Sequence, residues 1–306
     1  MDMTWDEASD TLREWRGMSV RDSEQVVELG ERLVRDYSSK LQDELWLVCE
    51  QVFIASLDTG RFDLANLCLD KLKEKFPKSS RVMKLDAMGM EAEGRFDDAL
   101  NVYDELEKLD QTDAAIRKRK IAVFKSQGYT SLAIKHLTIY LQSFMADQEA
   151  WMELADLYVK EMDYKKAAFC VEELILSNAF NHLYHQRYAE IMYTIGGQEN
   201  LETARRYFAQ AVKLSSNTNI RALYGLMLTS GSSTQSRGDT KARNSKQYAN
   251  WAGKMVLSKY KNVWSEGGTV DETKFLPKIT PESDLPQLTA SVSQMLGQIS
   301  LSDASS

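Results

Sequence analysis

A short motif recurs at a fixed interval along the chain, and it constrains the fold more than any other feature. Each of the first four copies has a turn sequence followed five residues later by an alanine, as in Gly60-Arg-Phe-Asp-Leu-Ala, and the fifth copy, which begins at Gly197, has a longer turn. The first four alanines are each 34 residues apart and the fifth follows after 37; they are Ala65, Ala99, Ala133, Ala167 and Ala204. A chain with such a period folds as stacked copies of one small unit rather than around a single central core.

A period of 34 residues is typical of the tetratricopeptide repeat, a unit of two helices joined by a turn. In the fourth copy, apolar residues stand at i, i+3, i+4 and i+7; they are Trp151, Leu154, Ala155 and Tyr158. We expect the small alanine where the two helices cross closely, and the turn glycine where a helix ends with positive φ. The sequence therefore predicts an all-α, tetratricopeptide-repeat superhelical solenoid of about five to six helical hairpins.

Two departures from the repeat pattern concern its turns. Met162 stands where earlier copies have Gly60, Gly94 and Gly128. Pro77 ends the second helix of the first copy, and later copies have no proline at that position. We expect both departures to be tolerated, because the repeat depends on the sizes of packed side chains rather than on particular chemical groups.

The domain organisation follows from the repeat and from the composition beyond it. Helices at residues 5–18 and 23–38 are predicted to cap the array, with Ser23 as a helix N-cap. The predicted parts are capping helices in 1–40, the repeat array in 41–228, a flexible loop in 229–245, a C-terminal helix of the array in 246–264 and a loosely ordered tail in 265–306. Within the tail, residues 288–301 could form a helix if another surface receives its apolar face.

Composition and charge exclude several classes of function. The 306 residues include 38 Lys and Arg against 45 Asp and Glu, so nucleic acid is not an expected partner. No run of 18 consecutive apolar residues occurs, so we expect membrane contact only indirectly, through partners. The acidic N-terminus lacks the apolar core of a secretion signal and the three cysteines are widely spaced, which favours the cytosol.

Catalytic motifs are absent from the sequence. The one metal-like spacing is His182-x-x-His185 with Cys170 upstream, and two ligands at the start of a helix do not make a metal site. We expect a structural role for these residues, no cofactor and no enzymatic activity, with a metal-dependent enzyme as the weakest hypothesis. The cationic run Arg117-Lys-Arg-Lys is expected to be a solvated helix face that pairs with partner proteins.

The inner groove of the predicted solenoid is the candidate binding surface. In such arrays the first helix of each unit lines the groove through its fifth, ninth and twelfth positions. The candidate residues are Lys84, Met88, Glu91, Lys118, Ala122, Lys125, Met152, Asp156 and Val159. This groove is mixed, apolar with a basic middle, and its methionines suit adaptable contacts. No ninth position is asparagine, which argues against a carboxylate-gripping site for chaperone tails.

Several segments resemble one family beyond what the generic repeat requires. They lie at residues 43–58, 115–122, 147–158, 166–174, 181–184, 207–211 and 248–252. Over nearly its whole length the chain resembles the tetratricopeptide-repeat family that forms subunit 2 of the endoplasmic reticulum membrane protein complex.

This resemblance implies a peripheral scaffold subunit on the cytoplasmic side of the endoplasmic reticulum membrane. The complex would insert transmembrane segments, including those of tail-anchored proteins. The implied partners are a cytosolic subunit of metalloprotease-like fold without catalytic activity and the cytosolic regions of membrane-spanning subunits. The alternative is a soluble tetratricopeptide-repeat co-chaperone or client-peptide receptor, which the basic middle of the groove favours.

Overall fold

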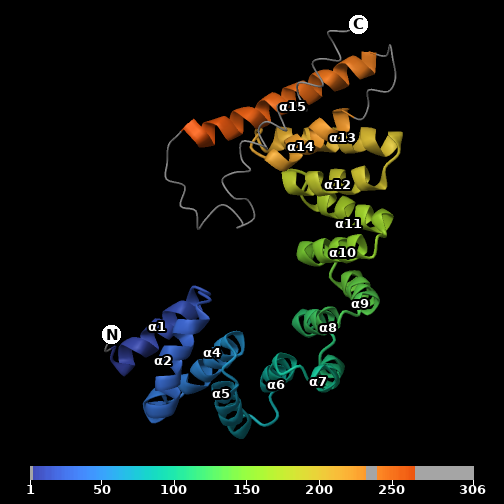
Figure 1. Ribbon diagram of the computed structural model, residues 1–306. Helices are drawn as coiled ribbons and strands as arrows, with labels where there is room; N and C mark the ends of the chain where they lie inside the picture. Colours follow the sequence, from blue (N-terminus) through green and yellow to red (C-terminus); the bar gives the residue numbers. More distant parts are fainter. Residues whose placement is uncertain (1–2, 232–239, 266–306) are drawn as a thin grey trace. The chain divides into compact units, whose positions relative to one another are not determined.

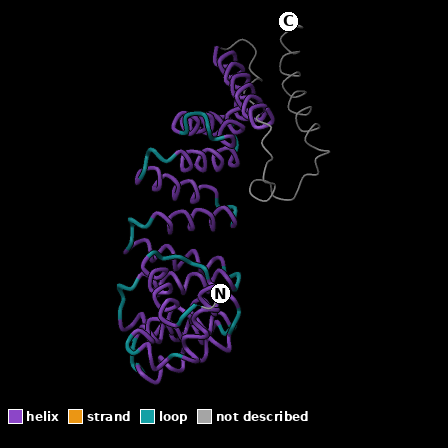
Figure 2. The backbone as a smooth tube through the Cα atoms, turned by 90° about the vertical axis from the view of Figure 1, so that its left-hand side faces the viewer, coloured by secondary structure: helices purple, strands orange, loops and turns teal. Residues whose placement is uncertain are grey.

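A computed structural model describes residues 3–231 and 240–265 of the chain, with only the backbone described for 231, 240–246 and 261–265. Within these ranges every regular element is a helix, as Figures 1 and 2 show. The helices belong to two compact units, Met1–Phe144 and Met145–Ser306. None of the described helices is both long and apolar enough to span a lipid bilayer.

The first unit begins with α1, α2 and a short α3, which span Trp5–Gly17, Ser23–Asp36 and Ser38–Leu41. Three helix hairpins follow, and the two helices of each hairpin pack against each other. These hairpins are α4 with α5 (Glu44–Thr59 and Phe62–Lys75), α6 with α7 (Ser80–Ala92 and Phe96–Leu109), and α8 with α9 (Ala114–Ser126 and Thr130–Ser143).

The second unit continues the series with three more hairpins among the described residues. They are α10 with α11 (Gln148–Lys160 and Tyr164–Ser177), α12 with α13 (His182–Ile195 and Gln198–Leu214), and α14 with α15 (Ile220–Gly231 and Thr240–Ser265). The predicted all-α tetratricopeptide-repeat solenoid of five to six hairpins is confirmed. Within each unit the apolar core passes from one hairpin to the next, as expected where each repeat contacts its neighbours.

The repeat motif has the conformation that its residue types predict. Gly60, Gly94 and Gly128 have φ of 73°, 79° and 79°, and Met162 takes the same left-handed conformation with φ of 59°. The five repeated alanines are buried, with at most 1% of the surface of each exposed. A larger side chain at these positions would force paired helices apart.

The cap of α2 differs from the prediction. Asp22, not Ser23, is the N-cap, and its carboxylate accepts a hydrogen bond from the Gln25 N–H at 3.2 Å. An aspartate at this position also interacts favourably with the positive end of the helix dipole. Ser23 is the first helical residue, and its hydroxyl instead donates to the Asp58 carboxylate at 2.7 Å.

The helices around the predicted loop of residues 229–245 extend further than expected. α14 continues to Gly231 and α15 already begins at Thr240. Thr229 and Ser230 are buried within α14, and the Thr229 hydroxyl donates to the Gly225 carbonyl at 2.7 Å. A threonine can remain inside a helix when its hydroxyl bonds back to the preceding turn in this way. Ser265, the first residue of the predicted tail, still belongs to α15, whereas residues 232–239 and the rest of the tail, including 288–301, lie outside the described residues.

Candidate protein-binding grooves

A cavity of about 420 Å³ opens in the first unit on the side of the first helix of each hairpin. We call it the first groove. It is lined by residues of α4, α6 and α8, together with Arg21 and Phe96 from neighbouring segments. The lining residues are Arg21, Ile54, Leu57, Asp58, Met88, Glu91, Ala92, Phe96, Arg119, Ala122, Val123 and Ser126.

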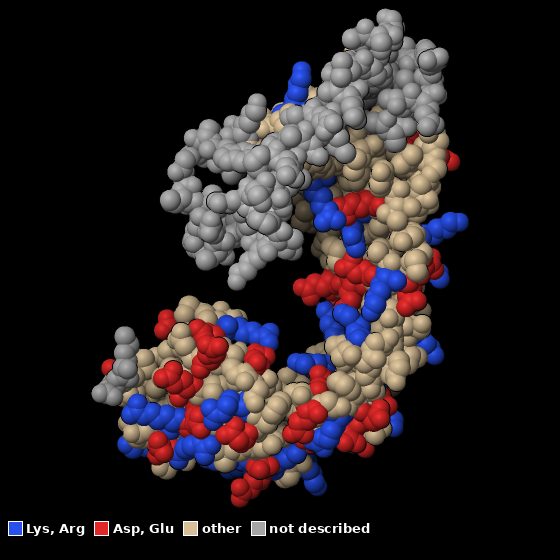
Figure 3. Space-filling view, in the orientation of Figure 1, with Lys and Arg blue, Asp and Glu red and all other residues tan. Residues whose placement is uncertain are grey.

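The charged side chains of the first groove are already paired. Arg21 donates to both oxygens of the Asp58 carboxylate, at 3.0 and 2.7 Å, and these bonds hold the pKa of Asp58 below its usual value. Arg119 donates to Glu91 at 3.2 Å, and the Tyr103 hydroxyl donates to the same carboxylate at 2.5 Å. Figure 3 shows cationic and anionic side chains intermixed over the visible face of this unit. The lining of the first groove therefore combines apolar side chains with two arginines and two carboxylates that pair with one another.

Three predicted groove residues of the first unit, Met88, Glu91 and Ala122, line this cavity. The three predicted lysines do not line it. Lys84 pairs with the Asp113 carboxylate, and the ammonium of Lys118 lies 5.8 Å from the centre of the Tyr140 ring. The first groove is therefore apolar with paired charges at its edge, and Lys84 does not give it the basic middle that the sequence suggested.

The cationic run at residues 117–120 pairs within the chain, so its interpretation as a solvated face is wrong for its last residue. Lys120 is buried, and its ammonium lies 2.6 Å from both the Asp104 and the Glu107 carboxylates. Burial disfavours the charged form of Lys120, but the bonds to the two carboxylates outweigh it and raise the pKa. Arg117 also pairs with Glu107, at 3.2 Å.

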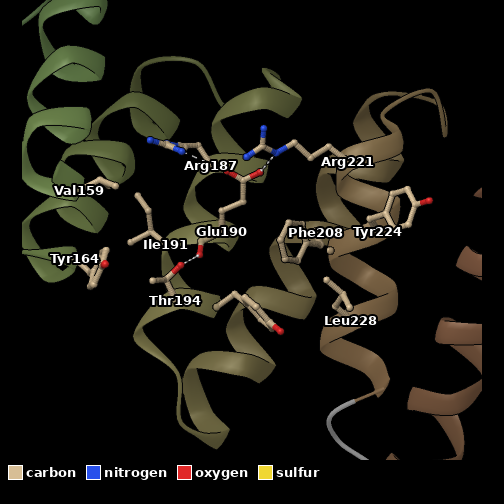
Figure 4. A pocket seen from close by; sticks show the side chains of 12 residues that line it. Val159, Tyr164, Arg187, Glu190, Ile191, Thr194, Phe208, Arg221, Tyr224 and Leu228 are labelled. Atoms are coloured by element: carbon tan, nitrogen blue, oxygen red, sulfur yellow. Dashed lines mark hydrogen bonds and ion pairs between the residues drawn. The ribbon is translucent and has the colours of Figure 1, made fainter. Parts of the chain in front are cut away.

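The second unit has its own cavity, of about 380 Å³, which we call the second groove (Figure 4). It lies among the first helices α10, α12 and α14, with contributions from α11 and α13. The lining residues are Val159, Tyr164, Arg187, Glu190, Ile191, Tyr193, Thr194, Phe208, Arg221, Tyr224, Gly225 and Leu228.

Two arginines flank one carboxylate at the edge of the second groove. Arg221 donates from Nε to Glu190 at 2.5 Å, and Arg187 donates from Nη1 to the same carboxylate at 3.5 Å. Figure 4 shows Arg187 and Arg221 on either side of the Glu190 carboxylate, and the side chains of Ile191, Phe208 and Leu228 line the same cavity. The second groove thus combines an apolar wall with an ion-paired rim.

The sequence predicted only part of the second groove. Val159 lines it, and Asp156 lies just outside and accepts a hydrogen bond from Arg187 at 2.5 Å, whereas Met152 is not among the lining residues. Arg187, Glu190 and Arg221 were missed. The signal that could have found them is the repeat register, because Arg187 and Arg221 are 34 residues apart, as are Asp156 and Glu190.

The His182-x-x-His185 pair has structural contacts. His185 is buried, and its Nε2 lies 2.8 Å from the Ala179 carbonyl oxygen. His182 Nδ1 lies 3.0 Å from the Asn219 amide nitrogen. Cys170 is buried, and burial raises the pKa of its thiol to about 12. In the part of the chain that the structure describes, no group of three or more His, Cys, Asp or Glu residues is arranged to hold a metal ion.

Helix hairpins at a 34-residue interval, with grooves lined by the first helix of each hairpin, define a tetratricopeptide-repeat protein. A solved structure agrees with this class: the C-terminal part of a tetratricopeptide-repeat protein from Cytophaga hutchinsonii has a TM-score of 0.59 with the present structure. The similarity covers 83% of this chain and 95% of that one, and at 15% sequence identity it concerns the fold alone.

Sequence comparison identifies the particular family. Residues 64–207 match the family described as the EMC2 TPR-like repeat domain. The chain is 49% identical to ER membrane protein complex subunit 2-A of Xenopus laevis over 89% of this chain and 91% of that protein. It is 34% identical to ER membrane protein complex subunit 2 of Dictyostelium discoideum over 74% of each chain. The chain therefore belongs to the family of ER membrane protein complex subunit 2.

Proposed function

We propose that this protein is a non-enzymatic scaffold subunit of the endoplasmic reticulum membrane protein complex and that its grooves hold other subunits. The observation that carries the proposal is the 49% identity, over 89% of the chain, with a relative named as subunit 2 of that complex. Packing between successive repeats fixes the geometry of a solenoid surface, so such a chain can hold partners at set positions. The grooves supply apolar contact surfaces for them.

The finer parts of the proposal follow from the family resemblance. The protein lies peripherally on the cytoplasmic side of the endoplasmic reticulum membrane and contacts the bilayer only through partners. It holds a cytosolic subunit of metalloprotease-like fold and the cytosolic regions of membrane-spanning subunits. The complex inserts transmembrane segments, including those of tail-anchored proteins. The structural contacts of His182 and His185 support a role without chemistry.

The alternative of a peptide-receptor co-chaperone has less support. It was favoured by the basic middle of the predicted groove, but Lys84 pairs with Asp113 and Lys118 contacts the Tyr140 ring. If the alternative were correct, reversing Lys84 and Lys118 to glutamate would abolish peptide capture and leave assembly with membrane subunits intact.

Affinity purification of the tagged full-length chain from endoplasmic reticulum membranes in mild detergent tests the proposal. Mass spectrometry should identify the other subunits of the complex in the purified sample. Recovery of the chain without any membrane subunit, or with soluble chaperones alone, would overturn it.

A further inference from the structure

Charged residues of the second unit form a ladder along the first helices of successive hairpins. Arg187 of α12 donates to Asp156 of α10 at 2.5 Å, and Arg221 of α14 donates to Glu190 of α12 at 2.5 Å. In both pairs the arginine follows its carboxylate by 31 residues. The ladder therefore alternates in sign and repeats with the hairpins.

The two arginines differ in what surrounds them. Arg187 lies between two carboxylates, since it also contacts Glu190, three residues further along α12. Three residues after Arg221 stands Tyr224, which occupies the repeat position that holds Asp156 and Glu190 in the two preceding copies. In the described part of the chain, Glu190 is the one carboxylate that pairs with Arg221, whose side chain is 72% exposed. Among the described residues, the ladder therefore has no carboxylate at its next position, on α14.

An apolar cavity adjoins this incomplete end of the ladder. Tyr224, Gly225 and Leu228 of α14 line the second groove together with Ile191 and Phe208 (Figure 4). Its volume of about 380 Å³ lies near the lower end of the roughly 300–1,000 Å³ range of ligand pockets. A cavity of this size suits apolar side chains of a peptide.

We propose that the second groove binds a segment of a partner protein that carries an acidic residue next to a large apolar residue. The partner's Asp or Glu pairs with the Nη groups of Arg221 and completes the ladder, while the apolar side chain enters the cavity. A carboxylate fits beside Arg221 better than a phosphate. The Glu190 carboxylate already lies 2.5 Å from Arg221 Nε, and it would repel a doubly charged phosphate more strongly than a singly charged carboxylate. This inference rests on the proposed function and adds the chemistry of the partner segment.

The test uses the full-length chain with a photo-crosslinking amino acid in place of Leu228, which lines the cavity and is half exposed. Crosslinking in cells followed by mass spectrometry should identify a segment of a complex subunit with an Asp or Glu beside a large apolar residue. Arg221→Gln should lower the crosslinking yield about three- to fivefold, since an ion pair of an exposed arginine contributes up to about 1 kcal/mol.

The matched control is Arg206→Gln on α13. Arg206 is also 72% exposed and pairs with one carboxylate, that of Glu202, but it does not line the groove. This variant should crosslink like the unchanged protein. Thermal melting of both variants detects a general loss of folding.

The possible results separate the two proposals. Crosslinking that is insensitive to Arg221→Gln, or that joins Leu228's position to a segment without Asp or Glu, overturns the partner chemistry and leaves the scaffold role. Recovery of complex subunits without any crosslink from position 228 also overturns the partner chemistry and leaves the scaffold role. Failure to recover any complex subunit with the unchanged chain overturns both.

Discussion

Met162 is a residue held in a conformation that its side chain disfavours. Its φ of 59° matches the glycines at equivalent turns, and a left-handed conformation costs an L-residue about 1–2 kcal/mol. Its side chain is 72% exposed, so little packing would be lost on removing it. We expect Met162→Gly to raise the free energy of unfolding by about 0.5–1 kcal/mol, after the greater chain entropy of glycine in the unfolded state is subtracted. Urea unfolding followed by circular dichroism measures the change.

The reverse substitution, Gly128→Met, is the control, because Gly128 has φ of 79° at the same position of the preceding hairpin. It should lower the free energy of unfolding by about 1 kcal/mol. If Met162→Gly left the free energy of unfolding unchanged or lowered it, the left-handed backbone of Met162 would not be a source of strain.

The Asp113 carboxylate has two structural roles. It caps α8 by accepting from the N–H groups of Ala115 and Ile116, and it pairs with Lys84 of the preceding hairpin. The hydrogen bond from Lys84 lowers its pKa in the folded protein. The resulting stability is present above the pKa of the unfolded chain, about 3.9, and is lost as the pH falls through the folded pKa. Asp113→Asn should therefore cost about 1 kcal/mol at pH 7 and weaken the loss of stability in acid.

A double-mutant cycle with Lys84→Met separates the ion pair from the cap. Once Lys84 is replaced, Asp113→Asn should have a smaller effect at pH 7, because asparagine also serves as an N-cap. Urea unfolding at pH 7 and near pH 3.5 provides the measurement. Equal effects of Asp113→Asn with and without Lys84 would show that the pair adds no stability.

At the scale of elements, α2 and α4 approach closely at Gly30. A Cβ atom added to Gly30 would lie 2.1 Å from the Val52 Cγ2 atom, and Val52 is fully buried. Gly30→Ala should therefore lower the free energy of unfolding by about 1–3 kcal/mol, despite the better helix propensity of alanine. Measurement of the urea midpoint tests this.

Gly89 of α6 provides the matched control. An added Cβ there would lie 3.6 Å from the Phe53 ring, an ordinary contact distance. Gly89→Ala should raise the free energy of unfolding by about 0.5–1 kcal/mol, because only the propensity effect remains. If Gly30→Ala and Gly89→Ala changed the free energy of unfolding in the same direction, the close approach of α2 and α4 at Gly30 would not be what limits the residue there.

The elements themselves were largely predictable from the sequence, because the repeated alanines and turn glycines report local packing and backbone conformation. The ends of the helices were less so. Thr229 and Ser230 suggest a loop by composition, yet they are buried in α14, where the Thr229 hydroxyl bonds to the preceding turn. The prediction of Ser23 as the cap of α2 was wrong, because the preceding Asp22 is an equally good cap residue and residue type does not separate the two.

At the scale of the whole molecule, the repeat register indicates some of the residues that line the two grooves but not the charges beside them. Met88, Glu91, Ala122 and Val159 do line cavities, as positions in the repeat register indicate. Lys84 does not give the first groove a basic middle, because the carboxylate that pairs with it comes from the start of the next hairpin, Asp113. Such pairing depends on how neighbouring repeats pack. Positions counted along one helix do not show which side chains of the next hairpin lie nearby.

Apolar residues on the surface of the second unit bear on how the whole subunit behaves without partners. Leu176 and Phe180 are 78% and 84% exposed, at the end of α11 and just after it. Large exposed apolar side chains promote association of isolated subunits. The double substitution Leu176→Gln and Phe180→Ser in the isolated full-length chain should reduce concentration-dependent self-association, measured by sedimentation velocity, and change the free energy of unfolding by at most about 0.5 kcal/mol.

Leu174→Gln is the control on the same helix, because Leu174 is fully buried two residues from Leu176. The same chemical change there should cost about 3 kcal/mol, since it removes apolar packing and buries an amide. A double variant at Leu176 and Phe180 that melts as early as Leu174→Gln would show that these side chains stabilise the subunit itself. Unchanged self-association at full stability would show that the attractive surface lies elsewhere on the chain.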